Sequence, residues 1–187
     1  QSIALNLKAP TDRGILDRLL ARADVVLENY RPGVMERLGY GWEVLHARHP
    51  RLIYGAVSGF GHTGPDAQKP AYDMVVQARG GVMSITGEEG GPPVRVGASI
   101  GDIVAGMFLA QGVLAALYDR QKTGKGAKID VAMLDSQLAI QEHSIALTTA
   151  TGQPPGRTGA RHPTITPFST YRASDGFFVI AAGNDAM

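Results

Sequence analysis

The chain has 187 residues, of which 44% are hydrophobic and 19% are charged, and its formal net charge at pH 7 is +1. This balance gives no general field that would attract nucleic acid or a membrane surface. The chain has no cysteine, which excludes disulfides, thiolate metal sites and a cysteine nucleophile and fits the reducing cytoplasm, where we expect the protein. The five histidines form no H-E-x-x-H or similar pattern, so the sequence predicts no metal site.

The first part of the chain alternates strand and helix patterns. Residues 2–9 alternate as a short strand would, and Thr11 is a candidate cap for a helix that runs to about Ala23. The next expected elements are a strand, two short helices and a second strand, over residues 24–29, 34–38, 42–48 and 51–57.

The second predicted strand leads into the stretch SGFGHTGP, whose glycines have the G-x-G-x-x-G spacing of dinucleotide-binding turns. That fingerprint requires the third glycine to open a helix, whose N–H groups hold the pyrophosphate. Here Gly64 is followed by Pro65, and Pro70 comes soon after, so no helix of useful length can begin. We therefore reject a nicotinamide or flavin site at this glycine loop.

The second half of the chain predicts longer helices. A helix is expected over residues 72–79, and a long helix follows Asp102 to about Arg120. Its apolar part, residues 103–117, is too short to span a bilayer and contains a glutamine and two glycines. A strand over 128–134 and a helix to about residue 150, capped by Asp135, complete this series.

The alternation of strands and helices up to residue 150 predicts an α/β fold, with a Rossmann-like parallel sheet covered by helices in residues 1–150. After a linker rich in proline and glycine, FSTYRA and FFVIAA flank Asp175-Gly176 and predict a hairpin. We expect the hairpin to begin a second, smaller α+β domain in residues 151–187. The chain opens on glutamine and stops directly after a strand, so we expect a fragment of a longer chain.

The first candidate for chemistry is Asp102. It precedes the long apolar helix, so its carboxylate would lie at the positive end of the helix dipole, which favours the ionised form. Gly101 removes a side chain beside it and would let another molecule approach closely, whereas Asp73 is expected to be solvated. Aspartate is also a favoured helix cap, with a stabilising effect of about 1 kcal/mol, so position alone leaves a purely structural role open.

The other candidates are groups that suit a phosphate or a nucleotide base. Tyr30 and Arg31 stand where a strand ends, at the edge where open parallel sheets bind ligands, and Arg37 follows on a short helix. Guanidinium groups bind phosphate with two parallel hydrogen bonds, and a tyrosine ring offers a flat face. Lys69 and Tyr72 follow the glycine loop. An ordinary turn with solvated side chains would explain the same residues.

Four segments occur in this order: ADVVLENYRPGVMERLG, GFGHTGP leading to KPAYD, GASIGDIVAGMFLAQGVLAAL, and KTGKGAKIDVAMLDSQL. Together they resemble the class III CoA-transferase family, which includes formyl-CoA and carnitine-type CoA-transferases and 2-methylacyl-CoA racemases. The resemblance implies that Asp102 is the catalytic residue and that coenzyme A is bound as a co-substrate, without a metal. It implies CoA contacts at Leu5, Asn6, Leu7, Lys8, Asn29, Tyr30, Arg31, Arg37, Lys69, Pro70, Ala71 and Tyr72.

The resemblance further implies a reaction and its partners. CoA would move from an acyl-CoA donor to a carboxylic acid acceptor through aspartyl anhydride and aspartyl-CoA intermediates. The full-length protein would form an interlocked homodimer, with no nucleic acid or membrane partner. The resemblance also implies that the CoA-binding domain over residues 1–150 lacks the family's first βα unit, and that the family's oxyanion glycine loop lies beyond this sequence.

Two alternatives stay open at this point. The racemases pair their aspartate with a histidine where this chain has Tyr72, and tyrosine titrates near 10 rather than near neutral pH, which favours the transferase. The second alternative is a truncated CoA-binding piece without turnover.

Overall fold

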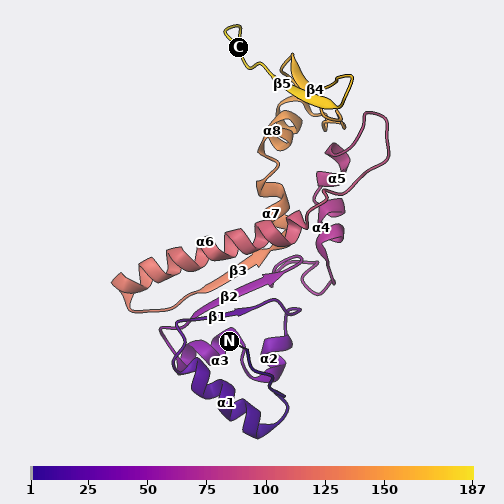
Figure 1. Ribbon diagram of the computed structural model, residues 1–187. Coiled ribbons are helices and arrows are strands. Elements are labelled where there is room, and N and C mark those ends of the chain that lie inside the picture. The colour runs from indigo at the N-terminus through magenta and orange to yellow at the C-terminus, as the bar shows by residue number, and fades with distance from the viewer. Residues whose placement is uncertain (1) are drawn as a thin grey trace.

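The computed structural model describes residues 2–187 (Figure 1). Its centre is a parallel sheet in the order β1-β2-β3, formed by Val25–Glu28, Ile53–Ser58 and Lys128–Ala132. Leu27 of β1 pairs with Gly55 of β2, which pairs with Ile129 of β3. Parallel neighbours need crossover connections, and helices supply them here. The predicted α/β fold with a parallel, helix-covered sheet is confirmed.

Helices pack on both faces of this sheet (Figure 1). One face is covered by α1 (Pro10–Leu20), α2 (Val34–Leu38) and α3 (Trp42–Arg48), around a core that includes the buried Leu45 and Tyr54. The other face carries α6 (Ile100–Thr123), which lies along β2 and β3. Gly55 permits this close packing, because a Cβ there would lie only 2.9 Å from Leu109 of α6.

The remaining elements lie on the side of the first residues of α6 (Figure 1). Before it come α4 (Asp73–Arg79) and α5 (Val82–Ile85). After β3, α7 (Met133–Ala139) and α8 (Glu142–Thr151) lead away from the sheet to the antiparallel hairpin of β4 (Phe168–Arg172) and β5 (Phe177–Ala181) (Figure 1). The hairpin was predicted, and the division at residue 150 stays a prediction.

The start of the chain differs from its sequence pattern. Residues 2–9 form no strand; instead, the Lys8 N–H donates to Asn6 Oδ1 at 3.1 Å, and the Asn6 N–H donates to Asp12 Oδ2 at 2.7 Å. Helix α1 begins at Pro10, and no side-chain hydrogen bond caps it. Thr11 therefore lies inside the first turn, because proline is well suited to the first helical position.

The segment after β3 also differs. The expected single helix over residues 135–150 is two helices, and the first starts at Met133, so Asp135 lies in its first turn rather than at its cap. The buried Gln141 lies between them, and its Nε2 donates to the carbonyls of Gly80 at 2.7 Å and Gln137 at 2.8 Å. A contact with a residue far away in sequence thus sets the break.

Helix α6 is longer than its apolar run suggests. It has 24 residues and starts before Asp102, which therefore lies in the first turn and not ahead of the helix. Within residues 2–187, α6 is the one helix whose length and composition would suit a membrane crossing, so the sequence-based argument that it is too short was wrong. Its place is in the sheet domain, since Arg120 near its end donates to the Asp24 carbonyl and carboxylate and to the Arg51 carbonyl.

Candidate active site

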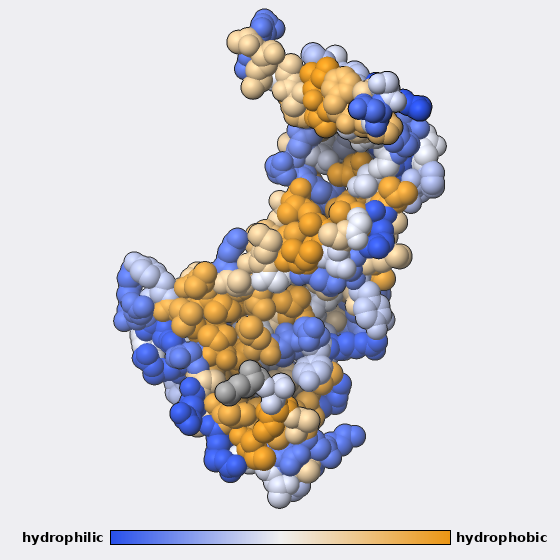
Figure 2. Space-filling view, in the orientation of Figure 1, coloured by the Kyte–Doolittle hydropathy of each residue, from blue (hydrophilic) through white to orange (hydrophobic). Residues whose placement is uncertain are grey.

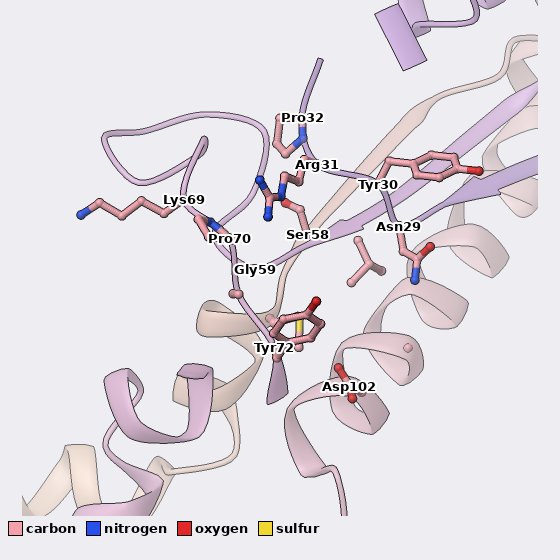
Figure 3. A pocket seen from close by; sticks show the side chains of 14 residues that line it. Asn29, Tyr30, Arg31, Pro32, Ser58, Gly59, Lys69, Pro70, Tyr72 and Asp102 are labelled. Atoms are coloured by element: carbon pink, nitrogen blue, oxygen red, sulfur yellow. The ribbon is translucent and has the colours of Figure 1, made fainter. Parts of the chain in front are cut away.

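A pocket of about 540 Å³ opens at the carboxyl edge of the sheet, where open α/β sheets bind their ligands (Figure 3). The segment after β1 forms one wall, the end of β2 and the segment after it form a second, and the first turns of α6 and the first residue of α7 close the floor. Its lining brings together eight residues proposed from the sequence, namely Asn29, Tyr30, Arg31, Lys69, Pro70, Ala71, Tyr72 and Asp102.

Asp102 is the third residue of α6 and projects into the pocket, on the side where Tyr72 also lies (Figure 3). Partial desolvation, and after it the negative charge of Asp73, raise the pKa of Asp102 from its ordinary value. The sequence-based expectation was the opposite, because it considered only the helix dipole. A raised pKa makes the carboxylate more basic, which favours nucleophilic attack in its ionised form.

Asp73, the first residue of α4, fixes the start of α6. Its Oδ1 accepts the N–H of Gly101 at 2.8 Å, and its Oδ2 accepts from Nε2 of the fully buried Gln77 at 2.8 Å. The Oε1 of Gln77 in turn accepts the N–H of Val96 at 2.8 Å. Asp73 is therefore a helix cap supplied by a distant segment, and the expectation that it is solvated was wrong.

Gly101 has a different role from the one expected. A Cβ at this position would lie 2.7 Å from Val76 Cγ2 and 3.0 Å from Asp73 Oδ1. The absence of a side chain at Gly101 thus lets helix α4 pack closely and does not make room for a ligand. This packing fixes Gly101, the residue before Asp102.

The two cationic residues of the pocket, Lys69 and Arg31, differ in whether an acidic residue pairs with them. Lys69 Nζ lies 2.6 Å from Asp66 Oδ1, and the side chain points away from the other labelled residues (Figure 3). Hydrogen bonds from Lys69 and then Arg79 lower the pKa of Asp66. Arg31 instead points toward the pocket interior (Figure 3), and no ion pair holds its guanidinium within residues 2–187.

Five residues proposed as CoA ligands do not line this pocket. Arg37 lies on α2, and its Nη1 would be 3.1 Å from a Cβ on Gly33. The others, Leu5, Asn6, Leu7 and Lys8, lie in the segment before α1. Their part in CoA binding stays a prediction.

Sequence reasoning missed several lining residues. Ser58 ends β2 and Gly59 follows it, just as Asn29 follows β1, and this shared position is the signal that could have found them. A Cβ on Gly59 would overlap Ala71, so glycine lets the returning loop close on the strand end. Gly106 lies one turn after Asp102 on the same helical face, and Met133 directly follows β3.

Comparison with known proteins gives a family match over the whole chain. Residues 1–187 match the model of CoA-transferase family III. The acetyl-CoA:oxalate CoA-transferase of Acetobacter aceti is 51% identical over 188 residues, which cover 100% of this chain and 48% of that protein. The human succinyl-CoA:glutarate CoA-transferase is 40% identical, over 99% of this chain and 42% of its own length. The chain thus spans about half the length of the curated relatives it matches.

A solved structure has the same fold. The crystal structure of a CaiB/BaiF family protein from Brucella suis superposes with a TM-score of 0.93 at 39% identity and covers 100% of this chain and 49% of that one. The match of the family model over the whole chain and the similarity of the named relatives lead to one conclusion: the chain belongs to CoA-transferase family III.

Proposed function

We propose that the complete protein transfers coenzyme A from an acyl-CoA thioester to a carboxylic acid, with Asp102 as the nucleophile. The observation that carries this proposal is the carboxylate of Asp102 in the pocket at the sheet edge, in a chain of the CoA-transferase family. The charges of Arg31 and Lys69 and the ring of Tyr30 around the same pocket suit the phosphates and adenine of CoA.

The chemistry proceeds in four balanced steps. An Asp102 oxygen attacks the thioester carbonyl, the C–S bond breaks, and CoA leaves as a thiolate from an acyl-aspartyl anhydride. The thiolate attacks the Asp102 carbonyl and releases the donor acid as a carboxylate. The acceptor carboxylate attacks the resulting aspartyl-CoA and expels the thiolate again. That thiolate then attacks the acceptor carbonyl, which gives the new acyl-CoA and restores the Asp102 carboxylate.

We further propose that the acceptor is a small dicarboxylic acid. The support is the set of acids in the relatives' names, which are oxalate, mesaconate and glutarate. Arg31 is suited to the free carboxylate of such an acid as well as to phosphate, because its guanidinium is unengaged by other residues of the pocket.

A product assay tests both proposals. The complete protein is incubated with acetyl-CoA or succinyl-CoA and, in turn, with oxalate, mesaconate or glutarate, and the new CoA thioester is measured by mass spectrometry. We expect transfer to at least one acid, and hydroxylamine should trap Asp102 as a hydroxamate in the presence of donor. Asp102→Asn should bind CoA but lose transfer by several orders of magnitude.

The assay also separates the racemase. α-Proton exchange on a 2-methylacyl-CoA in deuterated water, with no dependence on an acceptor acid, would replace the transferase proposal. Tyr72 argues against such exchange, because it stands where the racemases have the histidine that would serve as the second acid/base. We also propose that the complete protein is a homodimer, which analytical ultracentrifugation tests directly.

A further inference from the structure

Strand β1 ends in a buried carboxylate that neither the proposed chemistry nor the pocket lining uses. The side chain of Glu28 is 4% exposed. Its Oε2 accepts the N–H of Tyr30 at 2.7 Å, and its Oε1 accepts the hydroxyl of Tyr54 at 3.1 Å. The first of these contacts holds the turn over residues 29–32, which forms one wall of the pocket.

The same carboxylate meets the glycine loop through His62. Nε2 of His62 lies 3.4 Å from Glu28 Oε1, and the imidazole is 7% exposed. The contact is electrostatic rather than a well-aligned hydrogen bond, since Nε2 is buried without a hydrogen-bond partner in the described chain. The buried imidazole therefore has a polar neighbour at Nε2 only while the Glu28 carboxylate is in place.

Two further contacts fix His62 to β3. Its backbone N–H donates to Asp130 Oδ2 at 2.9 Å, and its ring Nδ1 lies 3.2 Å from Lys128 Nζ. Lys128 and Asp130 share a sheet face with Glu28 and Tyr54, because they are in register across the strands. His62 therefore ties the loop over residues 59–72 to the sheet at a defined point.

The Glu28 carboxylate thus contacts residues of both walls of the pocket, namely Tyr30 and His62. The turn over 29–32 carries Tyr30 and Arg31, and the loop over 59–72 carries Lys69 and Tyr72. An unpaired buried carboxylate is costly, so its donors favour the conformation in which both walls are in place.

We propose that Glu28 and His62 form a clasp that positions the two CoA-binding walls relative to each other. Both are positioning residues, which act through the turn and the loop and do not touch the substrate. The inference rests on the proposed function for the identity of the ligand, but the clasp itself is a property of the free protein.

Tyr54 provides the matched control. Tyr54→Phe removes another partner of the same carboxylate, yet it leaves the contacts to Tyr30 and His62 intact. If Glu28 only stabilises the core, Glu28→Ala and Tyr54→Phe should affect CoA binding alike. If it forms the clasp, only Glu28→Ala should weaken CoA binding.

The experiment measures CoA affinity by calorimetry and acyl-CoA kinetics in the complete protein. We expect Glu28→Ala and His62→Ala each to raise the Kd for CoA about tenfold, which corresponds to about 1.4 kcal/mol, and to leave kcat at saturating donor within about threefold. Glu28→Gln, which keeps an acceptor for the Tyr30 N–H but loses the charge that faces His62, should recover only part of the affinity. In a double-mutant cycle the two alanine changes should together cost about as much as Glu28→Ala alone, because that change already removes the contact with His62.

Hydrogen exchange in the absence of CoA gives an independent readout. Glu28→Ala should speed exchange at the Tyr30 amide and in residues 59–72, whereas Tyr54→Phe should not. Unchanged exchange in both segments, fully multiplicative losses of affinity, or equal weakening by Tyr54→Phe would each overturn the clasp. A further outcome is that the wild-type protein binds no CoA while Glu28→Ala still speeds exchange in these segments. That result would defeat the proposed function and the CoA-positioning role, and leave the clasp as a structural contact alone.

Discussion

At the scale of single residues, the Asp102 carboxylate lies near groups whose positions the sequence pattern did not predict. The position of Asp102 near a helix start could be predicted, because a polar residue precedes a long apolar run. Its neighbour Asp73 could not, since 28 residues separate the latter from Gly101, whose N–H it accepts. The pKa of Asp102 therefore depends on a tertiary contact, and its raised value opposes the dipole argument.

The raised pKa of Asp102 predicts a pH-dependent effect on stability. The folded protein binds this proton more tightly than the unfolded chain does, so ionisation of Asp102 costs stability as the pH rises through the raised pKa. Asp102→Asn should therefore make the protein slightly more stable at pH 7, and the gain should shrink as the pH falls toward the ordinary aspartate value of about 4. Thermal unfolding across this range measures it, and a loss of stability at pH 7 would contradict the prediction.

The unequal engagement of the two pocket cations predicts unequal losses of CoA affinity. Arg31→Ala should raise the Kd for CoA by more than tenfold, because a charge-assisted hydrogen bond contributes about 1.5–3 kcal/mol. Lys69→Ala should cost less, since Lys69 must first leave Asp66. Asp66→Asn, which releases Lys69, should tighten binding.

Calorimetry with the single variants distinguishes these cases. Dephospho-CoA provides the control, because a residue that meets the 3′-phosphate should matter less for that ligand. Equal losses for Arg31→Ala and Lys69→Ala would refute the ranking.

At the scale of elements, the sequence predicted the bounds of helices that glycines delimit. Contacts between residues distant in sequence set the bounds of other elements. The helices over 34–38 and 42–48 were predicted with their observed bounds, since glycines separate them. The hairpin followed from its Asp-Gly turn. The break before α8 depends on Gln141 and the carbonyl of Gly80, and the segment over 2–9 has a strand pattern but pairs with no strand in the described chain.

Three glycines of α6 predict opposite responses to one substitution. A Cβ on Gly101 would lie 2.7 Å from Val76, and one on Gly112 would lie 2.7 Å from Ile129, whereas Gly106 has nothing within 4 Å. Gly101→Ala and Gly112→Ala should each destabilise the protein by about 1–3 kcal/mol through overpacking. Gly106→Ala should stabilise it by about 0.5–1 kcal/mol, because alanine favours the helix.

Chemical denaturation of the three variants tests the series within one helix. The Gly106 variant serves as the internal control for helix propensity, since it differs from the other two only in the space around the new methyl group. A destabilised Gly106→Ala together with a tolerated Gly101→Ala would be inconsistent with this packing.

At the scale of the whole molecule, the described chain leaves a large apolar surface uncovered. Ile103, Met107, Leu114 and Tyr118 of α6 are each at least half exposed and recur at helical spacing. Figure 2 shows apolar residues gathered over this part of the molecule, and the hairpin exposes more, including Phe177. We expect apolar side chains exposed along one helix face to associate with another surface.

This surface predicts self-association of the 187-residue chain when it is produced alone. Sedimentation velocity should detect oligomers or aggregates at micromolar concentration, because apolar burial contributes about 25 cal/mol per Å². Leu114→Lys should reduce the association, and Glu43→Lys on the opposite sheet face serves as a control for added charge. A monodisperse monomer would contradict the prediction.

The contact between Glu28 and His62 also has a consequence for how the two positions vary among homologous sequences. A substitution at position 28 alone would leave His62 without its acidic neighbour, and a substitution at position 62 alone would leave a buried charge short of one contact. The two positions are therefore expected to change together among homologues, so that lineages without an acidic or amide side chain at the end of β1 also lack the imidazole in the glycine loop. Position 54, whose hydroxyl contacts neither wall, should drift between tyrosine and phenylalanine independently of both.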